Sequence, residues 1–373
     1  MVGVQRRTHE EVTDLVASGG RVGITDVAKR AGVSVTTVSH VLSSRRPVAE
    51  ATRQKVLRVI EELDYRPNEV ARSMRVQRTS TVGLVVPNIS HPFYTAAARG
   101  LEDALRPEGY HCIVTSTDAD RDVERDAVRQ LLSRVDGFVI SGADKRTEDI
   151  QPILDAKLPL VMLGADIPGP GFDVVTNADF ESGSLAAQHM LERGHRRIAF
   201  ITAEDDFAAG ARRVEGYRSA LDKAGLSTEA SLVIRAAASL EGGAKALANL
   251  RKLAEPPDAV ICVSDVMAIG AMYAAREAGL RIPEDVAVMG FDDTEAAALV
   301  APPLTTMATA SRDHGRKAGE LILRRIQDGT ADVEPQRVVF PAKLIQREST
   351  LGRWRGLLRV LPGRERRLLA RLG

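Results

Sequence analysis

The segment from Ser34 to His40 gathers short side chains that can both donate and accept hydrogen bonds. If it is helical, Val38 and Val41 share one face and the hydroxyl and imidazole groups lie on the other. Such groups suit phosphate oxygens and the edges of bases in a major groove, which predicts contact with nucleic acid. The alternative is a solvated hairpin of helices without a ligand. The outward residues are Val35, Thr36, Thr37, Ser39 and His40.

The elements that must position this segment are two short helices joined by a tight turn, between Ile24 and Leu42. Thr25 is a suitable N-cap for the first helix, Gly32 suits the left-handed residue that ends it, and Ser34 can cap the second. A third helix is predicted over 50–63, which completes a small all-α head. The predicted inner face of the first two helices consists of Val27, Ala28, Ala31, Val33, Val38, Val41 and Leu42.

A second group of residues with chemical potential follows the ends of strand-like runs further along the chain. One such end leads to His91, Phe93 and Tyr94, and the others lead to 264–265 and 291–293. Ligands of parallel sheets bind outside the carboxyl ends of the strands, so these ends predict a binding site. Phe93 and Tyr94 could instead be core residues at a strand–helix junction, and Asp265 could be only the N-cap of a helix.

The elements behind these ends alternate strand-like apolar runs with amphipathic helices from Thr79 onward. This alternation predicts an α/β body with two successive doubly wound parallel sheets. The predicted strands of the first sheet are 82–86, 112–116, 137–140 and 160–163, and those of the second are 198–202, 260–263 and 286–291.

Charge separates the head from the body. The chain has 373 residues and a net charge of +1, but residues 1–78 carry +5, residues 79–349 carry −10 and residues 350–373 carry +6. A basic head on an acidic body predicts that the head meets a polyanion. Charge alone does not distinguish nucleic acid from an anionic membrane surface.

Several classes of protein are disfavoured by what the sequence does not contain. We find no apolar run near the roughly 20 residues of a membrane helix and no secretory signal, so we expect a cytoplasmic protein. Cys112 and Cys262 fall in apolar stretches and are expected in the core. The histidines lack metal-site spacing, and no phosphate-binding loop or nucleophile elbow is present, so we expect no metal, no cofactor and no enzyme activity.

These features together resemble the LacI/GalR family of transcriptional repressors, over about residues 22–349. The resemblance rests on the 24–42 segment, on Tyr65 to Arg75 and on the run from Gly290 to Thr306. It implies base contacts by Thr36, Thr37 and His40, and phosphate contacts by Ser34 and Ser39. It further implies a hinge helix after Pro67 that enters the minor groove, with Ala71 at the groove and Met74 as a wedge between base pairs.

For the body, the resemblance implies two subdomains like those of periplasmic sugar-binding proteins, with a small-molecule effector between them. Arg213 and Asp292 would bind polar groups of the effector, and Ser264 stands where Asn is usual. Phe207 and Ala209 stand where purine-binding members of the family carry polar residues, which argues against a purine as the effector. A carboxylate and a guanidinium beside aromatic rings suit a sugar-like polyol. The expected effector site comprises His91, Phe93, Tyr94, Phe207, Arg213, Ser264, Asp265 and Asp292.

We therefore predict a homodimeric repressor that binds a palindromic double-stranded DNA operator. Rival interpretations are a solute-binding module of periplasmic type and an enzyme built on the same sheets. Pro362 and Gly363 interrupt the leucines of the tail, which predicts a loose basic extension or a short amphipathic helix and leaves a tetramer open. The predicted parts are a disordered extension (1–21), the helix-turn-helix head (22–66), the hinge (67–78), the effector domain (79–349; one subdomain at 79–177 and 310–338, the other at 178–309 and 339–349) and the tail (350–373).

Overall fold

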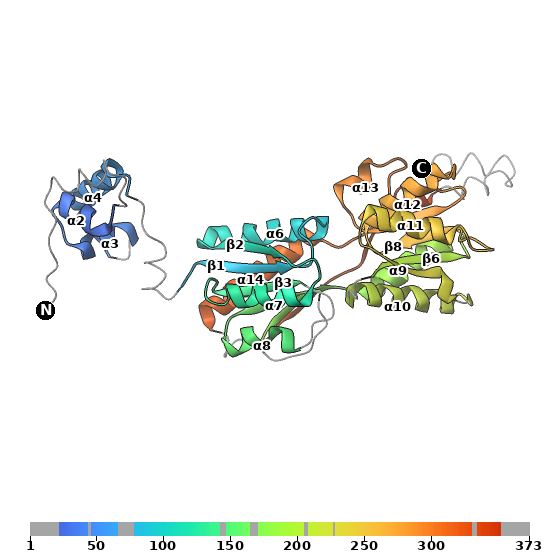
Figure 1. Cartoon of the computed structure of the whole chain (residues 1–373), viewed down its shortest axis with the longest axis horizontal. Coiled ribbons are helices and arrows are strands. Elements are labelled where there is room, and N and C mark those ends of the chain that lie inside the picture. The colour runs from blue at the N-terminus through green and yellow to red at the C-terminus, as the bar shows by residue number, and fades with distance from the viewer. Residues whose placement is uncertain are drawn as a thin grey trace, which may run out of the picture. The chain divides into compact units, whose positions relative to one another are not determined.

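The structure is a computed structural model that describes residues 22–43, 46–65, 78–141, 147–164, 171–204, 208–226, 228–329 and 334–351. The chain divides into two compact units, residues 1–79 and residues 80–373 (Figure 1). The predicted N-terminal extension, the hinge segment from 67 to 77 and the tail beyond Leu351 lie outside the described residues.

The described part of the first unit contains three helices, α2 (Ile24–Ala31), α3 (Val35–Ser43) and α4 (Glu50–Glu62). Val27, Val38 and Val56 are fully buried between them, so one apolar cluster fixes all three helices. Gly32 has φ of +61° and ends α2 in the left-handed conformation, as the sequence predicts. Leu42, predicted on the inner face, is instead 37% exposed.

The start of α2 differs from the prediction. Gly23, not Thr25, is the N-cap residue, and Thr25 is an exposed residue of the first helical turn. The Asp26 carboxylate accepts a hydrogen bond from the Gly23 N–H at 2.9 Å. Because the Asp26 carboxylate binds the N–H of Gly23, the helix is capped at Gly23, and Thr25 already lies inside its first turn.

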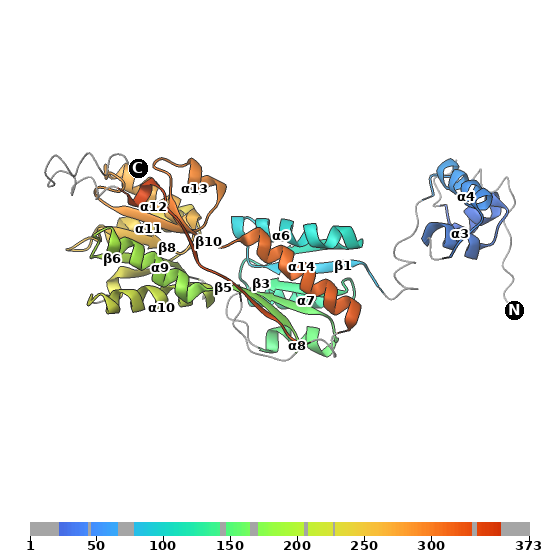
Figure 2. The ribbon, with the colours of Figure 1, turned by 180° about the vertical axis from the view of Figure 1, so that it is seen from behind.

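The second unit contains two six-stranded sheets. The first has the strand order β11-β5-β4-β3-β1-β2, with every neighbouring pair parallel. Helices α6 and α14 cover one face, and α7 and α8 cover the other (Figures 1 and 2). The bounds are β1 (Thr81–Val86), α6 (Pro92–Leu105), β2 (His111–Ser116), α7 (Arg121–Leu131), β3 (Gly137–Ser141), α8 (Thr147–Asp155), β4 (Leu160–Leu163), β5 (Asp173–Asn177), α14 (Ser311–Asp328) and β11 (Arg337–Phe340).

The second sheet has the order β12-β10-β9-β8-β6-β7, in which only the edge strand β12 is antiparallel to its neighbour. Helices α9 and α10 lie on one side of it, and α11 and α12 lie on the other (Figure 1). The bounds are α9 (Asp179–Glu192), β6 (Ile198–Ala203), α10 (Ala208–Lys223), β7 (Val233–Ala236), α11 (Leu240–Leu250), β8 (Ala259–Cys262), α12 (Asp265–Glu277), β9 (Ala287–Asp292), α13 (Glu295–Leu299), β10 (Thr305–Ala308) and β12 (Lys343–Ile345).

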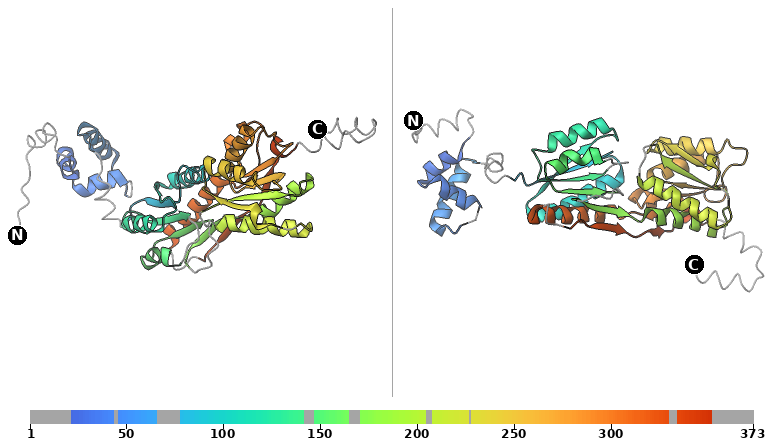
Figure 3. Two further views of the ribbon diagram at one scale, coloured as in Figure 1. Left: turned by 45° about the vertical axis from the view of Figure 1, so that its right-hand side comes forward. Right: turned by 90° about the horizontal axis from the view of Figure 1, so that it is seen from below.

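The chain passes between the two sheets three times: after β5, after β10 and between β11 and β12 (Figure 3). The predicted boundary at 338–339 falls inside β11, which pairs with β5 through Phe340. The last crossing is therefore at Pro341 and Ala342. Each predicted strand is present with its bounds shifted by at most one residue, whereas β5, β7, β10, β11 and β12 were not predicted.

Candidate functional site

In the head, α3 begins with a side-chain cap. The Ser34 hydroxyl accepts a hydrogen bond from the Thr37 N–H at 3.1 Å, and the two hydroxyls lie 2.9 Å apart. Val38 and Val41 are buried against α2 and α4, so the orientation of α3 about its axis is fixed. The cap predicted at Ser34 is therefore present.

The opposite face of α3 carries the polar residues that the sequence singles out. Thr36 and Val35 are exposed, and Thr37, Ser39 and His40 are half-buried. This arrangement offers hydroxyl and imidazole groups on a rigid helix next to the basic Lys29 and Arg30 of α2. The structure does not test the predicted DNA contacts of these side chains. Ala71 and Met74 lie outside the described residues.

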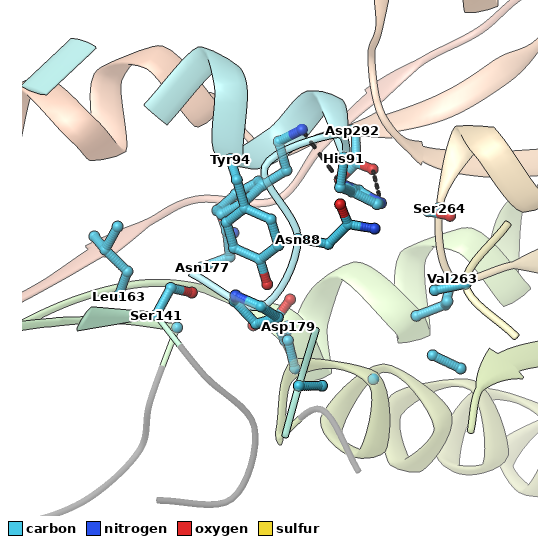
Figure 4. Close-up of a pocket in the computed structure, with 18 of the residues that line it drawn as sticks. Asn88, His91, Tyr94, Ser141, Leu163, Asn177, Asp179, Val263, Ser264 and Asp292 are labelled. Atoms are coloured by element: carbon cyan, nitrogen blue, oxygen red, sulfur yellow. Dashed lines mark hydrogen bonds and ion pairs between the residues drawn. The ribbon is translucent and has the colours of Figure 1, made fainter. Parts of the chain in front are cut away.

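In the second unit, the carboxyl ends of the two sheets enclose a cleft with a cavity volume of ≈ 230 Å³ (Figure 4). Six of the eight predicted effector residues line it: His91, Phe93, Tyr94, Arg213, Ser264 and Asp292. Phe207 lies outside the described residues. Residues about 200 positions apart, such as His91 and Asp292, are thus brought together at the strand ends, as expected for parallel sheets.

Arg213 is held in place by a buried ion pair that the sequence analysis missed. Its Nε lies 2.8 Å from Oδ1 of Asp179, and its Nη1 donates to the Val263 carbonyl at 2.9 Å. The guanidinium also stacks over the Phe291 ring, 4.4 Å from the centroid. Burial raises the pKa of Asp179, and the guanidinium opposes this increase. Asp179 follows the unpredicted strand β5, so recognising that strand would have revealed it.

Asp292 ends β9 and reaches the cleft from the second sheet. Its Oδ1 accepts a hydrogen bond from the Thr309 hydroxyl at 3.4 Å, and its buried Oδ2 has no hydrogen-bond partner among the described residues. Burial raises the pKa of Asp292 to about 7. A carboxylate so placed gains most from a ligand that donates a hydrogen bond or brings a positive charge.

His91 faces Asp292 across the cleft, with Nε2 of the ring 4.0 Å from Oδ2 of the carboxylate (Figure 4). Its Nδ1 accepts a hydrogen bond from the Phe93 N–H at 3.3 Å, which makes His91 the N-cap of α6. Burial, with a smaller effect from Arg213, lowers the pKa of His91 to about 4. His91 is therefore neutral at pH 7, and the contact with Asp292 is not an ion pair there.

Asp265 does not fit either of its expected roles. It is fully buried, and it is not among the residues that line the cleft. Its carboxylate accepts hydrogen bonds from the Thr306 hydroxyl at 2.6 Å and from the Thr294 N–H at 2.8 Å. The N-cap of α12 is Ser264, which accepts from the Met267 N–H. The Asp265 side chain therefore points toward the sheet, and its hydrogen bonds link the start of α12 to β10 and to the segment after β9.

The first sheet contributes polar lining residues that the sequence analysis did not select. Asn88, Ser141 and Asn177 follow or end β1, β3 and β5, and Asp118 lies in the turn after β2 (Figure 4). Their position directly at strand ends is the sequence feature that could have identified them as lining residues. With the aromatic rings of Phe93 and Tyr94, they give the cavity a lining of amide, hydroxyl, carboxyl and aromatic groups.

Comparison with known proteins agrees with this architecture. Residues 23–68 match the model of the bacterial regulatory proteins, lacI family, and residues 187–350 match a periplasmic binding protein-like domain. The HTH-type transcriptional repressor PurR of Vibrio atlanticus is 37% identical over 308 residues, which cover 82% of this chain and 92% of that protein. The regulator DegA of Bacillus subtilis is 35% identical over 335 residues, 88% of this chain and 97% of its own length. The chain belongs to the lacI family of bacterial regulatory proteins.

Solved structures of this LacI-family regulator's relatives share both units. The lac repressor dimer bound to operator has a TM-score of 0.80 at 26% identity, with 89% of this chain and 100% of that chain covered. The transcriptional regulator CelR in complex with cellobiose has a TM-score of 0.67 at 33% identity, covering 88% and 100%. The prediction of a LacI-family transcriptional repressor, with a helix-turn-helix head and a periplasmic-binding-protein-like effector domain, is confirmed.

The described residues contain no cluster of three or more His, Cys, Asp or Glu side chains that could hold a metal ion. No helix in the described part of the chain is long and apolar enough to cross a membrane.

Proposed function

We propose that this regulator binds a palindromic operator as a homodimer and that a small polyhydroxylated ligand in the cleft sets its affinity for DNA. The observation that carries the proposal is the match of residues 23–68 to the lacI-family model, on a head whose α3 presents polar side chains from a fixed position. The proposed role of the cleft is to bind the ligand, not to convert it into a product.

The DNA contacts are assigned to α3 and its flanks. Thr36, Thr37 and His40 face the base edges, and Ser34 and Ser39 face phosphates. Val35 and Thr25 extend this surface, and Ala71 and Met74 contact the minor groove. Support comes from the lac repressor structure, whose title describes a dimer bound to operator. Two copies of α3 related by two-fold symmetry would require a palindromic site.

Dimer formation is supported by exposed apolar side chains on one long side of the second unit. Ile113 and Val114 are each 39% exposed on β2, Tyr273 is 63% exposed on α12 and Leu299 is 83% exposed on α13. Figure 1 shows β2, α12 and α13 along the upper side of this unit. Leu299 and Tyr273 are the most exposed large apolar side chains of the described residues, as is typical of a surface that another protein covers.

Regulation follows from the position of the cleft between two sheets joined by three crossings. A ligand that contacts both walls has different affinities for open and closed arrangements, and it shifts the population toward the one that it binds better. The polyol class is supported by the mixture of carboxylate, amide and aromatic groups in the cleft and by the relative CelR, which was solved with cellobiose.

The test begins by selecting DNA from a randomised pool with the full-length protein and measuring binding to the selected sequence by fluorescence anisotropy. Thr36→Ala should weaken binding to the selected site by about 10- to 100-fold, as expected for the loss of a base contact. Binding to unrelated DNA should change little. The matched control is Gln54→Ala, at an exposed position on α4 of the same head, which should bind like the wild type.

Two outcomes would contradict the proposal. One is the selection of no common sequence, and the other is an equal loss of affinity in Thr36→Ala and Gln54→Ala. A selected sequence without two-fold symmetry would contradict the dimeric part alone.

A further inference from the structure

Acidic side chains outnumber basic ones among the described residues that line the cleft. Asp118, Asp179 and Asp292 are acidic, and Arg213 and His91 are the basic groups. His91 is neutral at pH 7 because burial lowers its pKa to about 4, and burial raises the pKa of Asp179 and Asp292. The described lining therefore carries three carboxyl groups, which a cationic ligand would hold in the ionised form, and one permanent cation.

That one cation is already engaged by the protein. Nε of Arg213 is paired with Asp179, Nη1 donates to a backbone carbonyl, and the face of the guanidinium lies against Phe291. A phosphate or carboxylate group of a ligand would have to compete with the Asp179 carboxylate for this arginine. It would also be repelled by Asp118 and by the ionised form of Asp292.

Asp292 is only partly satisfied by the protein, since Thr309 donates to its Oδ1 but no described residue donates to its Oδ2. The side chain of Asp292 is 6% exposed, and its Oδ2 accepts no hydrogen bond. Asp118 is exposed at the rim of the same cleft. A buried, unpartnered carboxylate oxygen is costly, so a ligand that supplies a charged donor stabilises it more than a neutral donor does.

Aromatic rings add to this preference. The Phe93 and Tyr94 rings lie edge to face with centroids 5.2 Å apart, and both line the cleft. The faces of such rings attract cations as well as the apolar faces of sugar rings. Asn88, Ser141 and Asn177 provide amide and hydroxyl partners for the hydroxyl groups of a ligand.

We propose that the cleft selects a cationic polyol, such as an amino sugar, whose ammonium group pairs with Asp292 and is favoured by Asp118. This inference rests on the proposed function, since it names the chemical class of the ligand that the cleft takes. It predicts that sugar phosphates and sugar acids bind weakly and that a neutral sugar binds less tightly than its amino derivative.

The experiment compares ligands that share one scaffold and differ in charge. Isothermal titration calorimetry of the full chain at pH 7.5 would use glucose, glucosamine and glucose 6-phosphate, then the galactose and mannose sets. Cellobiose would be compared with the disaccharide of glucosamine. We expect the amino member of at least one set to bind about tenfold or more tightly than its neutral parent, and the phosphorylated member not to bind.

Variants assign the preference to the carboxylates. Asp118→Asn should reduce affinity for the amino sugar several-fold and leave the neutral parent unchanged, because only the charge at the rim is removed. Asp292→Asn should abolish the preference. The matched control is Glu181→Gln, on the exposed surface of α9 and outside the cleft lining, which should keep it. Thermal unfolding and operator binding of each variant verify that it is folded.

The inference is overturned if neutral sugars or sugar phosphates bind more tightly than the amines, if no amine in any set binds, or if Asp118→Asn and Asp292→Asn keep the preference. Operator binding distinguishes this failure from that of the proposed function. A chain that selects a palindromic site but prefers a neutral sugar contradicts only the inference, whereas a chain that selects no DNA contradicts the proposed function.

Discussion

At the level of single residues, burial keeps several histidines of this regulator neutral. Burial lowers the pKa of His189 to about 4, with a smaller effect from Arg193, and it also lowers the pKa of His314. Nε2 of His189 lies 2.8 Å from the Thr350 hydroxyl, which links α9 to the last described turn of the chain. Protonation of this ring would place a charge in the core.

We predict that His189 makes the protein less stable in mild acid. Its pKa is about 4 in the folded state against an ordinary value of 6.5, so the unfolded chain binds the proton more tightly. The contribution to stability is complete above pH 6.5 and is lost as the pH falls toward 4, by up to about 3 kcal/mol. His189→Gln should therefore lose less stability than the wild type over this range, as measured by urea unfolding at several pH values.

Buried carboxyl groups have the opposite effect on stability as the pH falls, so the effect of His189 must be measured by comparing variants. Burial raises the pKa of Asp265 to about 7, with a further contribution from Asp292, and these carboxyls stabilise the fold as the pH falls from 7. Gln130→Ala, at an exposed position on α7 where no titratable group is removed, is the control and should keep the wild-type pH profile. An identical acid profile for His189→Gln and the wild type would contradict the prediction.

At the level of elements, the close packing of α9 and α10 positions the arginine of the cleft. A Cβ atom at Gly183 would lie 1.9 Å from the Arg213 carbonyl oxygen, and one at Gly216 would lie 1.9 Å from that of Phe180. The two helices therefore touch through reciprocal glycines. Because Arg213 is on the contact itself, the distance between these helices sets where its guanidinium meets Asp179.

Gly183→Ala should therefore damage the cleft as well as the fold. The added methyl group must push α10 away, which should cost about 1–3 kcal/mol of stability and reduce ligand affinity. The control is Gly319→Ala, where a Cβ atom would lie 2.6 Å from the Ala104 Cβ in the packing of α14 on α6. It should destabilise the protein but keep the affinity. Urea unfolding and calorimetry measure the two effects, and unchanged affinity in Gly183→Ala would contradict the argument.

The elements also explain which parts of the site could be predicted. Strands such as β1, β4 and β8 are continuous runs of buried apolar residues, a pattern visible locally. Strand β5 begins with Asp173, which is fully buried because Arg325 pairs with it from α14, 152 residues away. No local pattern reveals such a partner, so β5 was missed, and Asn177 and Asp179 at its end were missed with it.

At the level of the whole molecule, the cleft residues that the family resemblance implies lie where parallel strands end, whereas the residues of the proposed dimer surface were not predicted. An apolar side chain exposed on a helix gives the same sequence pattern as a buried one. Only the fold shows that Tyr273 and Leu299 are 63% and 83% exposed. They belong to α12 and α13, which Figure 1 shows on the same side of the second unit as β2.

This surface leads to a prediction about assembly. Tyr273→Glu combined with Leu299→Glu should weaken dimerisation by at least about 30-fold, because each change places a charge at an apolar contact of the kind that contributes about 2 kcal/mol. Operator affinity should fall with it, since two linked heads bind two half-sites and a single head does not. Sedimentation velocity over a range of protein concentrations measures the first effect, and anisotropy measures the second.

The matched control is Val123→Glu. Val123 is 47% exposed on α7, which covers the other side of the first sheet, so a charge there adds the same chemistry outside the proposed contact (Figure 1). This variant should remain dimeric and bind the operator like the wild type. Ligand binding in the cleft should persist in both variants because none of the three residues lines it. A double variant that stays dimeric would place the interface elsewhere, and a monomer with full operator affinity would show that the half-sites are bound independently.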